Sequence, residues 1–150
     1  MAEVLFYHLT GGSIEASLPE LLERSLARGW RVVLRCGSAA GMAGIDAMLW
    51  SYRDEAFLPH GTAAAGQAEM QPVYLTLGDE NPNGANVLML ADGGRATVAE
   101  MRGFERTCLI FDGRDERAVA AARADWREVK AAGLEAKYWA QEQGRWVQKA

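Results

Sequence analysis

Short apolar runs alternate with helical patterns along the chain. Six runs have the length and composition of buried strands, at residues 4–9, 31–36, 72–77, 86–90, 106–111 and 135–140. Strands that alternate with helices predict an α/β fold with a mostly parallel, Rossmann-like sheet that is covered on both faces. The last run alternates between apolar and polar positions more than the others, so we place it at an edge of the sheet.

Turn and cap signals set the expected bounds of the helices. Ser17-Leu18-Pro19-Glu20 is typical of a capping box with proline in the first turn, so one helix should follow it and end near Gly29. Two more helices are predicted at residues 43–50 and 115–132, the second closed by Gly133. Residues 61–68 show no periodicity and are predicted to be a loop. No linker or repeat is visible, so we expect one domain over residues 1–150.

Charge and cysteine content narrow the classes of function. The formal net charge is −4, whereas proteins that bind nucleic acid over their whole surface are usually strongly basic. Cys36 and Cys108 lie within apolar runs without a Cys-x-x-Cys spacing, so we predict buried reduced thiols rather than a disulfide or a metal pair. The N-terminus lacks the basic flank of a signal peptide, and no apolar run approaches the roughly 20 residues of a membrane span. We therefore expect a cytoplasmic chain without membrane contact, metal or cofactor.

The turn at residues 37–41 is the best candidate for small-molecule chemistry. Gly37-Ser38-Ala39-Ala40-Gly41 follows a strand and precedes a helix, where backbone amides can hold a phosphate. It lacks the G-x-G-x-x-G spacing, and no Gly-Lys-Ser/Thr follows it. Small residues that permit a tight turn are the simpler explanation. A nucleotide-binding, Rossmann-like enzyme that uses Gly37–Gly41 is kept as the alternative hypothesis.

No catalytic set is evident in the sequence. His8 lies within the first strand, His60 follows Pro59, and no serine lies in a G-x-S-x-G motif. A Cys/His dyad would need a cysteine from the middle of a strand, which is a poor place for an exposed nucleophile. We predict that the chain is not an enzyme by itself.

A basic and aromatic stripe on the last long helix is a stronger candidate for function. Arg123, Trp126, Arg127 and Lys130 follow the i, i+3, i+4, i+7 spacing, which puts them on one face of a helix. Arginine beside an aromatic ring suits a carboxylate that neighbours a hydrophobic side chain. The stripe therefore predicts a binding site for such a partner.

Two alternatives to this interpretation of the helix stay open. Trp126 also shares a helical stripe with three apolar residues, Val119, Ala122 and Val129. It therefore fits a place in the core as well as a place at the rim of a pocket. Asp125 and Glu128 dilute the positive charge. Direct binding of nucleic acid through the stripe is a further possibility, but the net charge and the lack of interleaved basic and aromatic residues on the strands speak against it.

A second aromatic block spans residues 49–60, Leu-Trp-Ser-Tyr-Arg-Asp-Glu-Ala-Phe-Leu-Pro-His. Trp50 ends a helical run, and Phe57 lies among charged residues and is less readily buried. His60 is more typical of a structural histidine than of a ligand. The block is predicted to be a rigid aromatic platform for a partner.

Taken in order, these residues resemble the chi subunit family of the bacterial DNA polymerase III holoenzyme. The matching features are Phe6-Tyr7, Gly29 with the strand at 31–34, Leu49-Trp50 with Phe57-Leu58-Pro59-His60, Pro72-Val73, Phe111-Asp112, and Arg123-Ala124-Asp125-Trp126-Arg127 closed by Gly133. The resemblance covers nearly the whole chain and departs most at residues 84–102. It implies a three-layer α/β/α protein in the clamp-loader part of the replicase, without polymerase activity of its own.

The resemblance also implies partners. Proteins of this family bind the acidic C-terminal tail of single-stranded DNA-binding protein, and in some bacteria also the psi subunit. Trp50 and Phe57 map to aromatic positions near the tail pocket of the family, and Arg123, Trp126 and Arg127 map to its basic and aromatic helix. Many members have Tyr and Lys where this chain has Trp126 and Arg127, and both changes keep an aromatic face and a cation.

The residues and the resemblance lead to one hypothesis. We expect a non-catalytic chi subunit that tethers the replicase to coated single-stranded DNA in DNA replication, with DNA contacted mainly through the partner. The tail pocket is expected to combine the aromatic block with the helix stripe; its predicted residues are Trp50, Phe57, Arg123, Trp126, Arg127 and Lys130. An apolar tail residue would bury against the aromatic rings while arginine binds its carboxylate.

Overall fold

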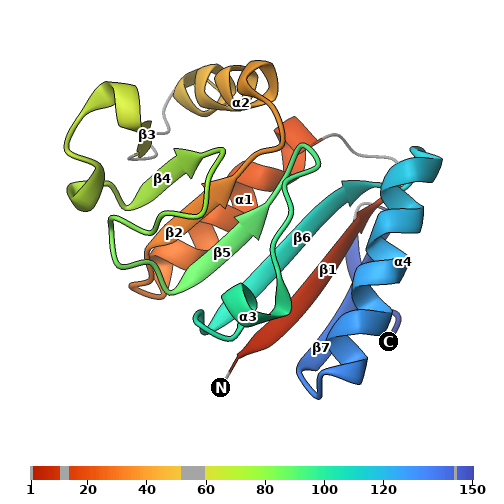
Figure 1. Ribbon diagram of the computed structural model, residues 1–150. Coiled ribbons are helices and arrows are strands. Elements are labelled where there is room, and N and C mark those ends of the chain that lie inside the picture. The colour runs from red at the N-terminus through yellow and green to blue at the C-terminus, as the bar shows by residue number, and fades with distance from the viewer. Residues whose placement is uncertain (1, 11–13, 52–59, 144) are drawn as a thin grey trace.

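Strands form a single twisted sheet at the centre of the molecule (Figure 1). The computed structural model describes residues 2–10, 14–51, 60–143 and 145–150. Within these residues the sheet has eight strands in the order β3-β4-β2-β5-β6-β1-β7-β8. Their bounds are β1 Glu3–Leu9, β2 Val32–Arg35, β3 His60–Thr62, β4 Val73–Thr76, β5 Val87–Leu90, β6 Arg106–Asp112, β7 Glu135–Glu142 and β8 Arg145–Gln148. The described pairings are parallel except that of β7 with β8, which confirms the predicted mostly parallel sheet.

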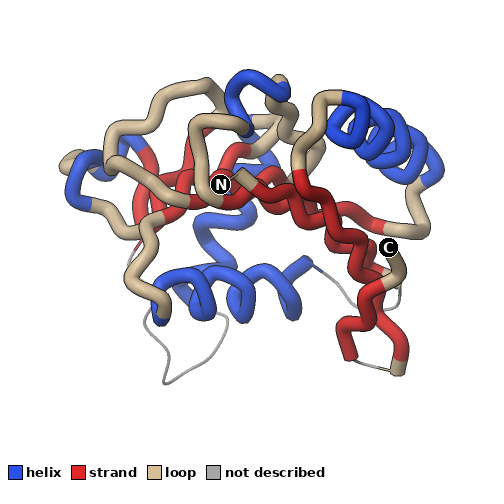
Figure 2. The backbone as a smooth tube through the Cα atoms, turned by 90° about the horizontal axis from the view of Figure 1, so that it is seen from below, coloured by secondary structure: helices blue, strands red, loops and turns tan. Residues whose placement is uncertain are grey.

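Helices cover both faces of this sheet (Figure 2). The helices are α1 Ile14–Ala27, α2 Ala39–Ser51, α3 Val98–Met101 and α4 Glu116–Ala131, with two 3₁₀ turns, η1 Ala63–Ala65 and η2 Ala68–Met70. Helices α1 and α2 pack on one face, and α3 and α4 pack on the other. The three-layer α/β/α arrangement is confirmed. None of the described helices is long and apolar enough to cross a membrane.

The central strands are apolar on both sides because both sides are covered. In β1, Leu5, Tyr7 and Leu9 belong to the core under α1 and α2, whereas Val4 and Phe6 belong to the core under α4. This split follows from the alternation of side chains along a strand. It also explains why the sequence of β1 is continuously apolar rather than alternating.

The start of α1 differs from the prediction. The helix begins at Ile14, so Ser17 lies buried within it and does not cap it, and Pro19 lies beyond the first turn. A proline at this depth removes one backbone hydrogen bond of the helix. Leu18, Leu21 and Leu22 are buried around it, and their packing outweighs that loss.

The C-terminal edge of the sheet also differs in detail. We predicted an edge strand at residues 135–140, but β7 lies second from the edge, and β8 forms the edge by pairing with it in a hairpin. An edge strand near the C-terminus is therefore confirmed, but a later segment forms it. Residues 61–68, predicted to be a loop, contain most of β3 and the turn η1. Helix α2 begins four residues before the predicted start at Ala43, and α3 was not predicted.

Several local predictions are confirmed. Gly29 and Gly133 follow α1 and α4 with φ of 80°, a left-handed conformation in which glycine is unstrained. Cys36 and Cys108 are free and buried, as predicted from their apolar surroundings. His60 is buried, with its Nε2 atom 3.2 Å from the Asp46 carboxylate, which agrees with the structural role predicted for it.

Candidate functional site

Helix α4 presents a row of cations next to partly buried aromatic rings. Asp115 caps the helix by accepting hydrogen bonds from the backbone N–H groups of Arg117 and Ala118. Ala122 and Val129 are buried against the sheet and fix which side of the helix faces the core. The opposite side leaves the predicted cations exposed, which are Arg123, Arg127 and Lys130.

Trp126 contacts both the core and the cations, so the two interpretations of this residue are compatible. Its ring packs edge-on against Phe6 of β1 at 5.3 Å and Tyr138 of β7 at 5.9 Å between centroids. The Lys130 ammonium lies 5.7 Å from the centre of the indole ring. The side chain remains partly exposed, so part of the indole ring is accessible beside the cations.

Tyr138 is at the centre of a larger aromatic cluster. Its ring stacks on Phe6 at 6.3 Å, and it contacts Phe111 of β6 and His8 of β1 at 6.1 and 5.8 Å. The Tyr138 hydroxyl lies 2.6 Å from Nδ1 of His8. We call this cluster, together with the neighbouring cations of the helix, the α4 aromatic surface; it comprises His8, Phe111, Trp126 and Tyr138 with Arg123, Arg127 and Lys130.

Arg123 acts electrostatically on the polar members of this surface. Burial lowers the pKa of His8, Arg123 lowers it further, and the Asp112 carboxylate opposes them. Burial raises the pKa of Tyr138, and Arg123 opposes this effect. Both side chains are therefore neutral near pH 7, and the positive charge of the surface belongs to the three cations of α4.

The cations of α4 are not neutralised by their own helix. Within the described residues, Arg123, Arg127 and Lys130 form no ion pair with a carboxylate. Asp125, which appeared in the sequence to dilute the charge, bonds instead to Arg95 at 2.8 Å on the other flank of the helix. The α4 aromatic surface is therefore locally positive, although the net charge of the chain is negative.

The aromatic block at residues 49–60 does not join this surface. Trp50 lies in the last turn of α2, is 58% exposed, and has its ring centroid 4.5 Å from that of His60. Helix α2 packs on the sheet face opposite to α4, through Ile45 and Leu49. Phe57 lies outside the described residues. The structure therefore brings together the four residues predicted on the helix, but it does not bring Trp50 to them.

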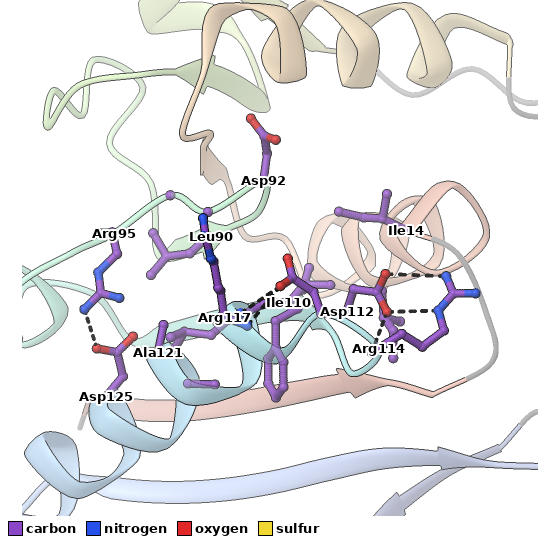
Figure 3. A pocket seen from close by; sticks show the side chains of 18 of the residues that line it. Ile14, Leu90, Asp92, Arg95, Ile110, Asp112, Arg114, Arg117, Ala121 and Asp125 are labelled. Carbon is purple, nitrogen blue, oxygen red and sulfur yellow. Dashed lines mark hydrogen bonds and ion pairs between the residues drawn. The ribbon is translucent and has the colours of Figure 1, made fainter.

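A cleft lies on the other flank of α4, at the carboxyl ends of β1, β5 and β6 (Figure 3). It has a volume of about 600 Å³ and an apolar floor that includes Leu9, Leu90 and Phe111. In open α/β sheets, ligands bind where neighbouring strands send their chains to opposite faces, and β1 and β6 do so here through α1 and α4. The cleft thus has the size and place of a small-molecule site.

The charged groups of this cleft largely neutralise one another. Arg95 bonds to Asp125, and Arg114 bonds to Asp112 at 3.1 Å. The Asp115 carboxylate accepts hydrogen bonds from backbone N–H groups at the N-terminus of α4, where a phosphate would otherwise bind. Because of these pairings, the cleft offers few free charged groups or amide donors that would bind a phosphate specifically.

The turn at residues 37–41 is filled by the protein itself. The Asp92 carboxylate accepts hydrogen bonds from the Ser38 backbone N–H at 3.1 Å and the Ser38 hydroxyl at 2.8 Å. A side chain at Gly37 would overlap the Asp92 backbone, and one at Gly41 would overlap the Asp92 carboxylate. The glycines therefore allow Asp92 to occupy the position that the nucleotide hypothesis assigns to a phosphate.

The sequence did not identify three residues of the α4 aromatic surface, which are His8, Phe111 and Tyr138. His8 and Phe111 are direct partners in the β1–β6 register, and Phe6 is the partner of Tyr138 in the β1–β7 register. Alternation along each strand gives the face on which a side chain lies, but the order of the strands decides which side chains meet. No local motif marked His8 or Tyr138 as neighbours, because 130 positions separate them.

Comparison with known proteins identifies the family of the chain and two relatives. The family model for "DNA polymerase III chi subunit, HolC" matches residues 1–137. The DNA polymerase III subunit chi of Pseudomonas aeruginosa is 36% identical over 92 residues, which are 59% of this chain and 63% of that protein. The probable DNA polymerase III subunit chi of Rickettsia prowazekii is 27% identical over 90 residues, 60% of this chain and 54% of that protein.

These two matches span about three fifths of the chain and a similar or smaller share of each relative. The family match is wider, since it runs from β1 through α4 to the start of β7 and ends one residue before Tyr138. With this extent of agreement, the chain belongs to the DNA polymerase III chi subunit family.

Proposed function

We propose that this protein is a non-catalytic accessory subunit that binds the acidic C-terminal tail of single-stranded DNA-binding protein through the α4 aromatic surface. Through this contact it would tether the clamp-loader part of the DNA polymerase III complex to coated single-stranded DNA. The observation that carries the proposal is a set of three cations on α4 that lie beside partly exposed aromatic rings and form no ion pair with any residue that the structure describes; they are Arg123, Arg127 and Lys130. Membership of the chi family gives the proposal its biological setting.

The chemistry of such a tail suits this surface. An acidic segment is attracted by the cations despite the net charge of −4, because the attraction depends on local charge within about one Debye length. Arg123 can bind the terminal carboxylate in a bidentate geometry, which favours arginine over lysine. An apolar terminal side chain would cover the exposed parts of Trp126 and Tyr138.

The expected affinity is modest. One charge-assisted contact and one buried side chain, less the cost of ordering the tail, correspond to roughly micromolar binding. Such binding allows repeated attachment and release, and several tails on one partner would raise the overall affinity through avidity.

The direct test is calorimetric titration with a synthetic acidic peptide that ends in phenylalanine with a free carboxylate. Arg123→Ala should weaken binding about tenfold, because it removes a charge-assisted hydrogen bond. Trp126→Ala should weaken it to a similar degree, and added salt should weaken binding to the wild-type protein.

Arg117→Ala is the matched control, since Arg117 is exposed on the same helix but lines the cleft on its other flank. The same peptide with a C-terminal amide controls for the carboxylate. No binding at low salt, or equal affinity in the Arg123 and Arg117 variants, would contradict the proposal. Electrophoretic mobility of short single-stranded DNA, with and without the partner, distinguishes direct from tethered binding.

The nucleotide hypothesis is not favoured by any contact in the described residues. Asp92 occupies the 37–41 turn, and Asp115 occupies the start of α4. Thermal unfolding with magnesium and nucleotides should therefore show no increase in Tm.

A further inference from the structure

Two polar groups at the centre of the α4 aromatic surface, the His8 imidazole and the Tyr138 hydroxyl, have no role in the contact proposed above. His8 and Tyr138 join β1 to β7 through a short hydrogen bond of 2.6 Å, in a cluster that is otherwise apolar. Both are partly exposed, so a ligand on this surface can reach them. Their position between Trp126 and Phe111 places them where a bound side chain and its carboxylate would lie.

The His8 ring is held from two sides. One ring nitrogen faces the Tyr138 hydroxyl, and the other lies directly against Gly113, where a Cβ atom would overlap the imidazole. Phe111 contacts the ring at 5.1 Å between centroids. The absence of a side chain at Gly113 therefore allows the imidazole to point at Tyr138 and keeps it there.

We propose that Tyr138 is a ligand-contacting residue of this surface and that His8 is the residue that positions its hydroxyl group. When Nδ1 of His8 carries a proton, it donates to the Tyr138 oxygen, and the hydroxyl proton is free to point at an anion beside Arg123. When Nδ1 is unprotonated, the hydroxyl donates to it and is not available to the ligand. This inference rests on the proposed binding of an acidic tail.

The charges around His8 determine whether the affinity for the acidic tail rises or falls with pH. Arg123 of α4 disfavours the imidazolium form, Asp112 at the end of β6 favours it, and Tyr138 of β7 is neutral. A carboxylate bound to Arg123 offsets the repulsion between the two cations, so binding raises the pKa of His8. The complex then holds more protons than the free protein, and affinity must increase as pH falls.

The experiment is titration of the same acidic peptide at several pH values between 8 and 5.5. The carboxylates of the peptide stay ionised over this range, so their own titration does not contribute. We expect binding to the wild-type protein to tighten about three- to fivefold as pH falls, the size of a partly exposed charge interaction. His8→Phe keeps a ring over Gly113 and should give a flat pH profile. Tyr138→Phe keeps the ring contacts and should weaken binding at pH 6.

Proton NMR gives a second measurement on the same samples. The chain has two histidines, so buried His60 serves as the internal reference for His8. Addition of peptide should raise the pKa of His8, whereas at each pH the ring resonances of His60 should keep their positions when the peptide is added.

The outcomes separate this inference from the function on which it depends. Binding that is independent of pH, a His8→Phe variant with the wild-type pH profile, or a Tyr138→Phe variant with full affinity would each overturn the role of the pair while leaving tail binding intact. Absence of binding at every pH would overturn both.

Discussion

At the scale of single residues, an ion pair between a buried arginine and a partly exposed glutamate holds the segment between β5 and β6. Arg35 ends β2 and is 5% exposed, with one guanidinium nitrogen 2.8 Å from Glu100 and another donating to the Arg95 backbone oxygen at 2.8 Å. Its Nε has no hydrogen-bond partner within the described residues. Glu100 also belongs to the capping box of α3. One carboxylate thus neutralises a buried cation and begins a helix.

We expect Glu100→Ala to lower the free energy of unfolding by about 2 kcal/mol, because it leaves a buried guanidinium without its counter-charge and removes a cap. Guanidinium chloride unfolding measures the change. Glu128→Ala, an exposed position on α4, is the control and should change stability by less than about 0.5 kcal/mol. Equal effects in the two variants would show that the Arg35 pair is not important for stability.

The two cysteines make a second prediction at this scale. Cys36 and Cys108 are 3% and 2% exposed, and burial raises the pKa of each thiol to about 12. Alkylation needs the thiolate, so iodoacetamide at pH 8 should label neither cysteine in the native protein and both after unfolding, as read by mass spectrometry. Rapid native labelling of either residue would contradict the burial described here.

At the scale of elements, Gly44 and Gly133 both have room for a side chain but differ in backbone conformation. A Cβ atom at Gly44 in α2 or at Gly133 after α4 would meet nothing within 4 Å, but Gly133 has φ of 80° and Gly44 is helical. Gly44→Ala should therefore raise stability by about 0.5–1 kcal/mol, and Gly133→Ala should lower it by about 1 kcal/mol. Thermal unfolding would show opposite shifts in Tm, and a shift of the same sign in both variants would refute the argument.

The elements also show what local sequence can and cannot predict. The strands β1, β2, β4, β5 and β6 were predicted because residues buried on both faces form continuous apolar runs. Helix α4 was predicted because Asp115 and Gly133 mark its ends. The start of α1 was wrong because Ser17 and Pro19 carry the signal of a helix start but are buried within the helix by tertiary packing. Strand β8 is half polar and is defined by its pairing with β7 rather than by its own pattern.

At the scale of the whole molecule, the order of the strands creates the candidate site. The stripe on α4 was predictable from helical spacing alone, because its residues are close in sequence. His8, Phe111 and Tyr138 come from three strands that are adjacent only in the folded sheet, where β1 lies between β6 and β7. The same topology separates Trp50 from α4, since the chain sends α2 to the face opposite to α4 (Figure 1).

This separation gives a prediction about Trp50. If the acidic tail binds the α4 aromatic surface alone, Trp50→Ala should leave the affinity for the acidic peptide within about twofold of wild type, whereas Arg123→Ala reduces it about tenfold. Trp50 is 58% exposed, so its removal should cost little stability, and unfolding measured in parallel confirms that the variant is folded. A loss of affinity in Trp50→Ala equal to that in Arg123→Ala would mean that both faces take part in the binding of one tail. Unchanged affinity would show that the α2 face takes no part in binding the tail and that the α4 aromatic surface binds it alone.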